Sequence, residues 1–414
     1  MVRARSGWEA SCRALRKALD VRVPLLIAAT AAAALALTGC GPGATTGGAV
    51  PARPAASPSP GTGVPAVSAG QRQAALPGMP AVVDPRDIYA ADRAGALSAT
   101  VAHFRPLLYV PNSESSSVDE IDPVTDRTVR HLLVGRNPQH VVPSYDLKTL
   151  WVLNDMSNSV TALDPRDGSP GRTVPVADPY NMYFTPDGRY ALVVEEARQT
   201  LAFRDPHTMA LIHAVPVNCS GIDHMDFTAD GRYLIASCEF SGQLIKVDVA
   251  QQKVVGYLPL GPRTSPQDVK TAPDGRTMYV ADRFRGGVWT VNPTTFTTTG
   301  FLPTGGDAHG LYVSRDSRTL YITNRAGGSV SLLSFATGTI VRTWPVPGGT
   351  PDMGGVSVDG KTLWLTGRYR SEIYALDTTT GQLLTRIHVG TQPHGMAVYP
   401  QPGRYSLGHT GVFR

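Results

Sequence analysis

The sequence predicts an all-β fold, a seven-bladed β-propeller whose blades have four strands each. Three observations predict it: one tight-turn motif recurs, strand-like segments flank its copies, and each of the two inner strands of the unit can be counted seven times. Successive turns are 41, 43, 44, 42 and 43 residues apart. A period in the forties with β-rich units is typical of propellers, whose blades cannot bury their faces alone.

The turn motif begins with an aspartate. Copies with a following glycine and basic residue start at Asp187, Asp230, Asp274 and Asp359, and copies without glycine start at Asp146 and Asp316. Because Asp-Gly favours a tight hairpin, we expect one strand to end before each turn and the next to begin after it.

Four strands, named A to D from the central axis outward, can be assigned to each unit. Examples are 182–185 for A, 190–194 for B, 244–248 for C and 254–258 for D. The C segment alternates apolar and polar residues with the period of two that is expected of a half-buried strand.

The inner strands give the blade count. The predicted ends of B are Asn112, Asn154, Glu195, Cys238, Asp282, Asn324 and Gly367, and A is predicted to begin near His140, Asn181, His224, Asp268, Gly310, Met353 and Gly395. The first B strand has no A strand before it, and the last A strand, 396–399, has no complete blade after it. We therefore expect the C-terminal strand to join the N-terminal blade, which closes the ring and removes exposed sheet edges.

Four B-strand ends carry a more specific pattern: YVPN at 109–112, WVLN at 151–154, YVAD at 279–282 and YITN at 321–324. With the aspartate-started turns, they resemble the YVTN-repeat, YncE-like β-propeller family over about 300 residues. The resemblance implies the architecture rather than an activity, because related propellers include lactonases, haem-containing nitrite reductases, nitrous oxide reductase and binding proteins.

The start of A and the end of B should lie together around one mouth of the central channel. The residue that follows B is acidic in three successive blades and arginine in the next three, and four histidines share this face. The ligand-rim candidates are His140, Asp155, Glu196, His224, Glu239, Asp268, Arg283, His309, Arg325, Asp352, Arg368 and His394.

Two interpretations of this rim stay open. A mouth with an acidic and a basic half can focus its field on a polar or zwitterionic ligand, and the arginines can hold a carboxylate or phosphate. Alternatively, the acids and bases pair with one another and leave no ligand site. Carboxylates with His140 and His224 can also hold a divalent cation or act as general bases, with His224 and Glu239 the weak metal candidates.

Cys219 and Cys238 are an even pair. In an exported protein a disulfide is favoured, and the alternative is a metal site that uses both thiolates and His224. No C-x-x-C-H motif occurs, so covalent haem is not expected, and no cofactor is predicted.

The N-terminal region predicts export. Residues 1–39 have a basic start, an apolar run of 15 residues at 23–37 and a sequence before Cys40 that resembles the lipobox of bacterial lipoproteins. The resemblance implies a lipid on Cys40 and attachment to the outer face of the cytoplasmic membrane; the alternative is an ordinary secretory signal that contains a cysteine.

Composition divides the rest of the chain. Residues 40–80 predict a flexible tether rich in Gly, Ala, Pro and Ser, 81–105 a short helical or irregular lead-in, 106–405 the propeller and 406–414 a C-terminal tail. Asp84-Pro85 favours a helix start, so a short helix is expected over 84–102.

Charge limits the partners. The net charge is +5, of which the first 22 residues contribute +4, since they hold six Lys or Arg against two acids. A mature chain of about +1 has no broad basic surface for nucleic acid. We expect a monomer that contacts the membrane through its lipid alone and binds a small polar or anionic ligand or an envelope protein.

Three functions remain from the sequence. The leading prediction is a non-catalytic propeller that binds a ligand or partner at the rim. The second is a lactonase-like hydrolase or isomerase that uses rim carboxylates, histidines and arginines, although no G-x-S-x-G, H-E-x-x-H or Walker motif supports a catalytic role. The third is a purely structural surface-display module.

Overall fold

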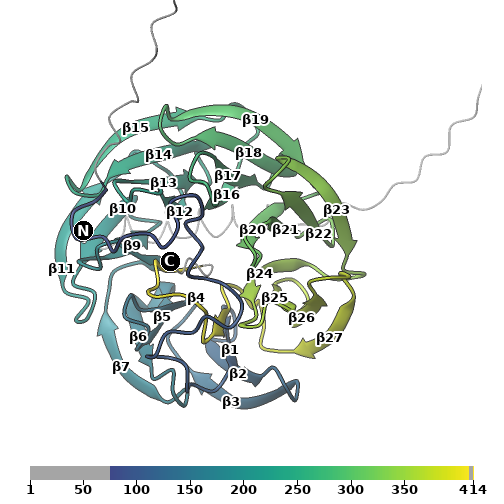
Figure 1. Cartoon of the computed structure of the whole chain (residues 1–414). Coiled ribbons are helices and arrows are strands. Elements are labelled where there is room, and N and C mark those ends of the chain that lie inside the picture. The colour runs from purple at the N-terminus through teal and green to yellow at the C-terminus, as the bar shows by residue number, and fades with distance from the viewer. Residues whose placement is uncertain (1–74, 410–413) are drawn as a thin grey trace, which may run out of the picture. The chain divides into compact units, whose positions relative to one another are not determined.

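The computed structural model describes residues 75–409 and Arg414, which contain seven four-stranded antiparallel sheets arranged around a central axis (Figure 1). The first sheet contains β28 (Ala397–Tyr399), β1 (Leu107–Asn112), β2 (Ser117–Asp122) and β3 (Arg127–Leu133). The all-β, seven-bladed prediction is confirmed.

The other six blades each use four consecutive strands. Three of them are β4 (Pro138–Pro143), β5 (Leu150–Asn154), β6 (Ser159–Leu163) and β7 (Pro170–Pro175); β8 (Pro179–Phe184), β9 (Ala191–Glu195), β10 (Thr200–Arg204) and β11 (Leu211–Pro216); and β12 (Ile222–Phe227), β13 (Tyr233–Cys238), β14 (Gln243–Asp248) and β15 (Lys253–Pro259). The remaining three are β16 (Pro266–Thr271), β17 (Met278–Asp282), β18 (Gly287–Asn292) and β19 (Thr297–Pro303); β20 (Ala308–Val313), β21 (Thr319–Asn324), β22 (Ser329–Ser334) and β23 (Thr339–Pro345); and β24 (Pro351–Val356), β25 (Thr362–Gly367), β26 (Glu372–Asp377) and β27 (Leu383–His388). One turn of 3-10 helix, η1 (Asp155–Ser157), follows β5.

The ring closes as predicted. The C-terminal strand β28 pairs antiparallel with β1, with Leu107 opposite Tyr399 and Tyr109 opposite Ala397. Closure also buries an apolar cluster between the last and first blades, in which Val398 packs with Leu108 and Trp364. The first blade therefore depends on residues from both ends of the propeller.

The turns explain the recurring aspartates. Gly188 has a φ of +71°, which glycine adopts without strain, and the backbone N–H of Arg189 donates to Asp187 Oδ1 at 3.2 Å. Where the glycine is missing, Leu147 and Ser317 take the left-handed conformation instead. The aspartate is thus the constant part of the turn because it satisfies the backbone.

Of the two alternatives predicted for the lead-in, helical or irregular, the structure has the irregular one: no helix forms over 84–102, and the segment consists of turns and isolated bridges. Its hydrogen bonds go to the propeller instead of to itself. Tyr89 Oη donates to Thr271 O at 2.8 Å, and a buried ion pair of 2.8 Å joins Asp92 to Arg315. These tertiary contacts replace the intrahelical hydrogen bonds that the Asp-Pro signal predicts.

The predicted tether also ends earlier than expected. Leu76, placed in the tether at 40–80, is 4% exposed and its N–H donates to Asp230 O at 2.8 Å. Cys40, the signal region and the rest of the tether lie outside the described residues. Within 75–409, no helix is long and apolar enough to cross a membrane.

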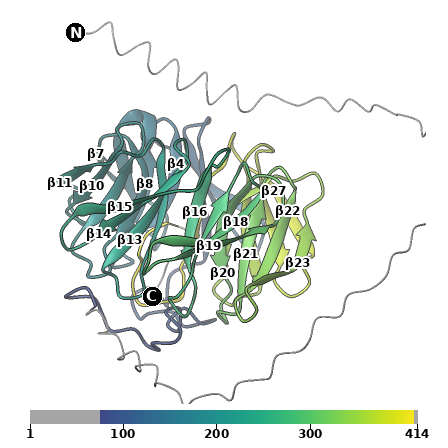
Figure 2. The same cartoon turned by 90° about the horizontal axis from the view of Figure 1, so that it is seen from above.

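The C-terminal segment, predicted as a tail, packs inside the ring (Figures 1 and 2). Ser406 N donates to Tyr145 O, and Phe184 N donates to Leu407 O at 3.1 Å. Gly408 forms a bridge with Tyr183 of β8. The segment thus adds backbone pairing to the inner edge of β8.

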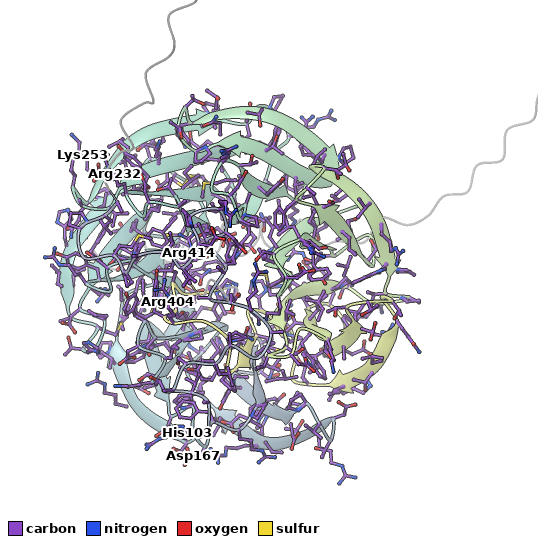
Figure 3. The ribbon with its side chains drawn as sticks, in the orientation of Figure 1. His103, Asp167, Arg232, Lys253, Arg404 and Arg414 are labelled. Carbon is purple, nitrogen blue, oxygen red and sulfur yellow. A yellow bond between two sulfur atoms is a disulfide. The ribbon has the colours of Figure 1, made fainter. Side chains whose placement is uncertain are left out.

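Arg414 holds the end of this segment near the ring centre, where Figure 3 labels it. It is fully buried, and its guanidinium donates to Asp226 Oδ1 at 3.2 Å and Phe227 O at 3.1 Å. Lead-in and C-terminal segment both contact the A-to-B turn side of the ring, opposite the predicted rim.

Candidate functional site

The rim lies where the sequence places it, because every B strand ends at its predicted residue. Six A strands begin about two residues earlier than predicted, and the seventh begins two residues later, at Ala397. In those six, pairing to B is interrupted near the start, as between Ile222 and Met225. The irregularity frees two residues from the regular ladder in four blades and one residue, Gln139 or Tyr180, in the other two.

The basic half of the rim is an ion-pair network. Arg283 lies 3.3 Å from Glu239 and 3.3 Å from Asp307, and Arg325 lies 3.0 Å from Asp307 and 3.5 Å from Asp352. Two of the three rim arginines are therefore paired, as the self-satisfied interpretation expects. Glu239, a weak metal candidate, belongs to this network.

Asp352 also holds two histidines. Its Oδ1 lies 3.0 Å from His309 Nδ1, and its Oδ2 lies 2.9 Å from His394 Nδ1. All three side chains are buried. Burial, followed by the charge of Arg325, holds the pKa of His309 well below its ordinary value, so a neutral imidazole is oriented by the carboxylate.

The acidic half is less well compensated. Asp223 is fully buried, and neither of its carboxylate oxygens has a hydrogen-bond partner among the described residues. Burial, then the charges of Glu239 and Glu196, raises the pKa of Asp223 well above its usual range. Asp223 is therefore held as the neutral carboxylic acid, because burial and the neighbouring acids oppose its charge.

Asp155 and Asp178 form a second carboxylate pair at this half. Asp155 Oδ2 accepts a hydrogen bond of 2.8 Å from Asn137. Burial and the neighbouring charge of Asp155 raise the pKa of Asp178 to about 8. Asp178 is therefore mostly protonated at neutral pH, as burial also favours at Asp223.

Arg368 is the rim arginine without an ion pair among the described residues. Its Nη1 is buried and has no hydrogen-bond partner in the same part of the chain. Burial raises the pKa of Asp352, and the charge of Arg368 partly opposes that rise. Burial and then the charge of Asp223 raise the pKa of Tyr180, and Arg368 again acts in the opposite direction. An unsatisfied cationic donor and an unsatisfied carboxyl group therefore both act on Tyr180.

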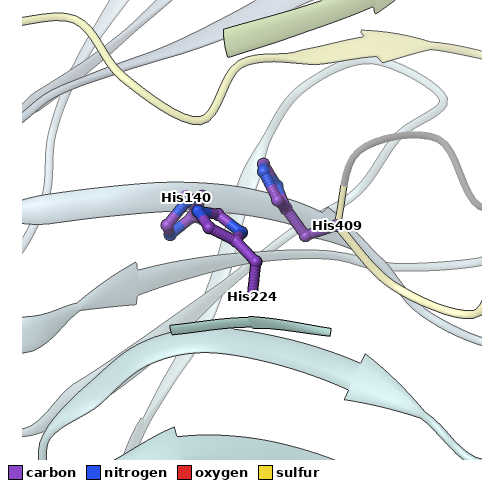
Figure 4. Close-up of side chains that lie close together, drawn as sticks. All are labelled: His140, His224 and His409. Carbon is purple, nitrogen blue, oxygen red and sulfur yellow. The ribbon is translucent and has the colours of Figure 1, made fainter. Parts of the chain in front are cut away.

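Below the rim, three histidines meet on the axis: His140 from β4, His224 from β12 and His409 from the C-terminal segment (Figure 4). One ligand nitrogen of each lies within 4.8 Å of the others. Gly395 makes room for His140, because a Cβ at Gly395 would lie 2.0 Å from His140 Cδ2. Burial lowers the pKa of His140 to about 3 and those of His224 and His409 well below the ordinary value, so all three rings are neutral at physiological pH.

Asp268, another rim candidate, has a structural partner set. Its Oδ1 accepts from Val269 N and its Oδ2 from Leu311 N, both at 2.9 Å. It thereby ties β16 to β20 at the inner edge of the ring. Burial still raises the pKa of Asp268 to about 6.

Cys219 and Cys238 form a disulfide with their Cα atoms 5.3 Å apart. Because the sulfurs are joined, they cannot also act as thiolate ligands beside His224. The bond links the loop before β12 to the end of β13, next to Asp223.

An open pocket of about 520 Å³ lies outside the mouth, lined in part by Arg283, Arg285 and Asp307. Arg283 and Asp307 belong to the ion network, and Arg285 lies 5.1 Å from the ring centroid of Trp289. The cationic groups of this pocket are thus already engaged.

The sequence analysis missed three residues of the site. Asp307 and Asp178 lie in loops that precede A strands, where no repeat pattern fixes the side-chain direction. His409 lies beyond the last repeat, so the repeat could not place it in the channel. Asp307 and Asp178 could have been found from the sequence, because each is an acidic residue one or two positions before a rim residue.

Comparisons with known proteins agree with this architecture. The model of the YNCE-like beta-propeller family matches residues 70–403, and no protein of curated function matches the chain. The periplasmic gluconolactonase of Pseudomonas aeruginosa has a similar structure, with a TM-score of 0.60, 20% identity, and coverage of 70% of this chain and 98% of that one. The Kuenenia stuttgartiensis hydrazine synthase gives a TM-score of 0.55 at 19% identity, with coverage of 68% and 92%. A functionally unknown protein from Desulfotomaculum acetoxidans gives 0.60 at 14%, with coverage of 70% and 98%.

Proposed function

This chain belongs to the YNCE-like β-propeller family, and from that premise we propose that it is an exported, lipid-anchored binding protein that takes a small polar ligand at the channel mouth. One observation carries the proposal: the buried carboxyl oxygens of Asp223 and the buried Nη1 of Arg368 lack hydrogen-bond partners in the described part of the chain. Buried polar groups are nearly always satisfied, so two in one mouth favour a ligand that supplies the missing partners.

The chemistry of the mouth limits the ligand class. A cationic or hydroxyl group near Asp223 would relieve the repulsion from Glu196 and Glu239, and a carboxylate would accept from Arg368. A zwitterion or a hydroxy acid carries both groups. The paired arginines, Arg283 and Arg325, then serve as scaffold rather than as the clamp.

A thermal-shift screen of amino acids, hydroxy acids and sugar acids, followed by calorimetry of hits, tests this proposal. Arg368→Ala should weaken a hit at least about tenfold, since it removes a charge-assisted hydrogen bond of about 1.5–3 kcal/mol. Arg370→Ala, an exposed arginine two residues away, is the matched control and should bind normally. No hit in the screen, or equal binding by Arg368→Ala, would contradict the proposal, and a hit only with envelope proteins would point to the protein-partner alternative.

A lactonase-like hydrolase is the second candidate, and the Asp352 arrangement favours it. A carboxylate that orients a histidine is the usual way to prepare a general base, and Asp352 contacts Nδ1 of both His309 and His394. The structural similarity to a periplasmic gluconolactonase is compatible with this candidate, because a propeller of this fold is the scaffold of that protein. Hydrolysis of a lactone panel that His394→Ala abolishes and the exposed His388→Ala retains would promote this candidate; no turnover across the panel would remove it.

Export and lipid attachment rest on the order of basic start, apolar run, lipobox-like sequence and tether. Cys40→Ser should move the protein from the membrane fraction to the soluble or secreted fraction and abolish labelling with a fatty-acid analogue. A wild-type protein that is not labelled would exclude the anchor without touching the ligand proposal.

A further inference from the structure

Five buried histidines share the channel, and they form two groups with different chemistry. His309 and His394 are each engaged through Nδ1 by Asp352. In the other group, His409 lies beside both His140 and His224, with ring centroids 4.2 Å and 5.3 Å away. The two groups also touch, since the ring of His140 lies 5.0 Å from that of His394, but Asp352 engages only His309 and His394. The second group is built from two separate blades and the end of the chain.

The hydrogen bonds of His140 leave one nitrogen for a ligand. Its Nδ1 donates to Tyr180 O at 2.8 Å, which places the lone pair on Nε2. His140 Nε2 is buried and has no hydrogen-bond partner within residues 75–409 and Arg414. Fixing the tautomer through a backbone carbonyl is how metal-binding histidines are commonly held.

His224 offers its Nε2 to the same space. This atom lies 3.2 Å from Asp223 Oδ1, yet the two do not meet hydrogen-bond geometry, and neither has another hydrogen-bond partner among the described residues. Its Nδ1 lies 3.1 Å from Asn181 Nδ2 and 3.3 Å from Tyr183 Oη. Both groups donate to Nδ1, because an amide nitrogen cannot accept and Tyr183 Oη already accepts from Met225 N at 3.2 Å, so the ring proton lies on Nε2, towards Asp223. A metal ion at Nε2 would displace this proton to Nδ1, which requires the Tyr183 hydroxyl and the Asn181 amide to turn.

His409 is delivered to the axis by the backbone of the C-terminal segment. Its N–H donates to Met182 O at 3.3 Å, and the preceding Gly408 has a φ of +115° against β8. A Cβ at Gly408 would lie 2.5 Å from Tyr183 Cα, so only glycine permits this approach. The backbone conformation at Gly408 therefore places the imidazole of His409 beside β8.

We propose that His140, His224 and His409 form a binding site for one transition-metal dication of the zinc, copper, nickel and cobalt class. Neutral imidazoles suit these ions, whereas magnesium and calcium prefer oxygen ligands. Zn–N bonds of about 2.0–2.1 Å place tetrahedral ligands roughly 3.3 Å apart, so side-chain rotation must bring the nitrogens closer by about 1–1.5 Å.

Three protein ligands leave a fourth position open, as in catalytic zinc sites. Asp223 lies beside His224, and Glu239 and Glu196 act on it from the acidic half of the mouth. These acidic side chains attract cations, and a bound dication would favour the ionised form of Asp223. The site thus has both a ligand set and an electrostatically favourable approach from the mouth. It does not depend on the small-ligand proposal.

Metal titration of the mature, chelator-stripped chain tests the site. Wild type should bind one equivalent of Zn²⁺ or Co²⁺ by calorimetry and elemental analysis, and Co²⁺ should develop the visible absorption of a four-coordinate ion. His409→Ala should weaken binding at least about 100-fold, because it removes one of three ligands. His103→Ala, at the outer edge of the ring in Figure 3, is the matched control and should bind as wild type does.

His224→Asn adds a second test in case His409→Ala disturbs the C-terminal segment, and circular dichroism of each metal-free variant checks its fold. Loss of binding in a folded His409→Ala or His224→Asn variant supports the site. No stoichiometric binding by wild type overturns it, as does unchanged affinity in both folded variants. If the three histidines only pack against one another, wild type will show no stoichiometric metal binding.

Discussion

Asp178 is a carboxyl group whose surroundings oppose its charge. Burial and Asp155 raise the pKa of Asp178 to about 8, so the folded chain holds this proton more tightly than the unfolded chain, where aspartate titrates near 4. Its contribution to stability is therefore full below about pH 4 and is lost as pH rises through about 8.

Asp178→Asn should remove this loss. The difference in unfolding free energy, wild type minus variant, should decrease as the pH rises from 5 to 8. The decrease should be at most about 1 kcal/mol per pH unit, because Asp178 is partly exposed and solvent screens its charge. Urea unfolding at pH 5, 6, 7 and 8 measures it. Asp126→Asn, at an exposed aspartate that shares the left-handed backbone, is the control, and parallel curves for wild type and Asp178→Asn would refute the expectation.

The disulfide is the second prediction at this scale. It closes a loop with a sequence separation of 19 residues, which corresponds to a stabilisation of about 3 kcal/mol through the unfolded chain. A Cys219→Ala, Cys238→Ala double variant should unfold with that much less free energy. Wild type in reductant should approach the same value, and two reactive thiols on the folded, oxidised protein would contradict the bond.

At the level of elements, the C-terminal segment depends on Gly408. Gly408→Ala should cost about 2–3 kcal/mol, because it adds backbone strain and a clash with Tyr183. Gly338→Ala is matched in conformation, with a φ of +66°, but nothing lies within 4 Å, so its cost should be about 1 kcal/mol. Chemical denaturation compares the unfolding free energies of the two variants. Trypsin should cleave faster at the exposed Arg404 in Gly408→Ala but not in Gly338→Ala. Equal losses of stability would mean that the close approach of Gly408 to Tyr183 is unimportant.

The elements also show what the sequence could predict. Every B strand ends at its predicted residue because the strand runs straight from the aspartate turn to the rim, where polar residues begin. Six of the seven A strands were placed two residues late because alternation becomes visible only after the interrupted pairing, for example after Ile222. The lead-in and C-terminal segment follow no repeat, and their conformation depends on backbone partners such as Thr271 and Met182, which are distant in sequence.

Site residues follow the same division. The repeat predicted that acids, arginines and histidines share one mouth, which the strand ends bear out. It could not predict that Asp307 neutralises Arg283 and Arg325, because that aspartate comes from a loop whose geometry the repeat does not specify. Periodicity therefore places positions, whereas pairing among long side chains is decided by tertiary contacts.

For the whole molecule, closure of the ring should control stability. Val398→Asp places a charge in the apolar cluster between the last and first blades and should cost at least about 3 kcal/mol. Val124→Asp, at a valine that is 86% exposed, should be nearly neutral. Thermal unfolding followed by tryptophan fluorescence should show the entire transition shifted; loss of one blade's signal with the rest unchanged would indicate that the blades unfold independently.

The axial histidines are contributed by residues as far apart in sequence as 140 and 409, on opposite sides of the β1–β28 seam. A chain that stops before residue 409 lacks one member of the set, so these side chains come together only after the C-terminal segment has packed inside the ring. Any molecule or ion held by them would bind native copies and ignore partly folded ones. Occupancy would then report that folding is complete, and it would slow unfolding of the entire propeller instead of protecting one blade.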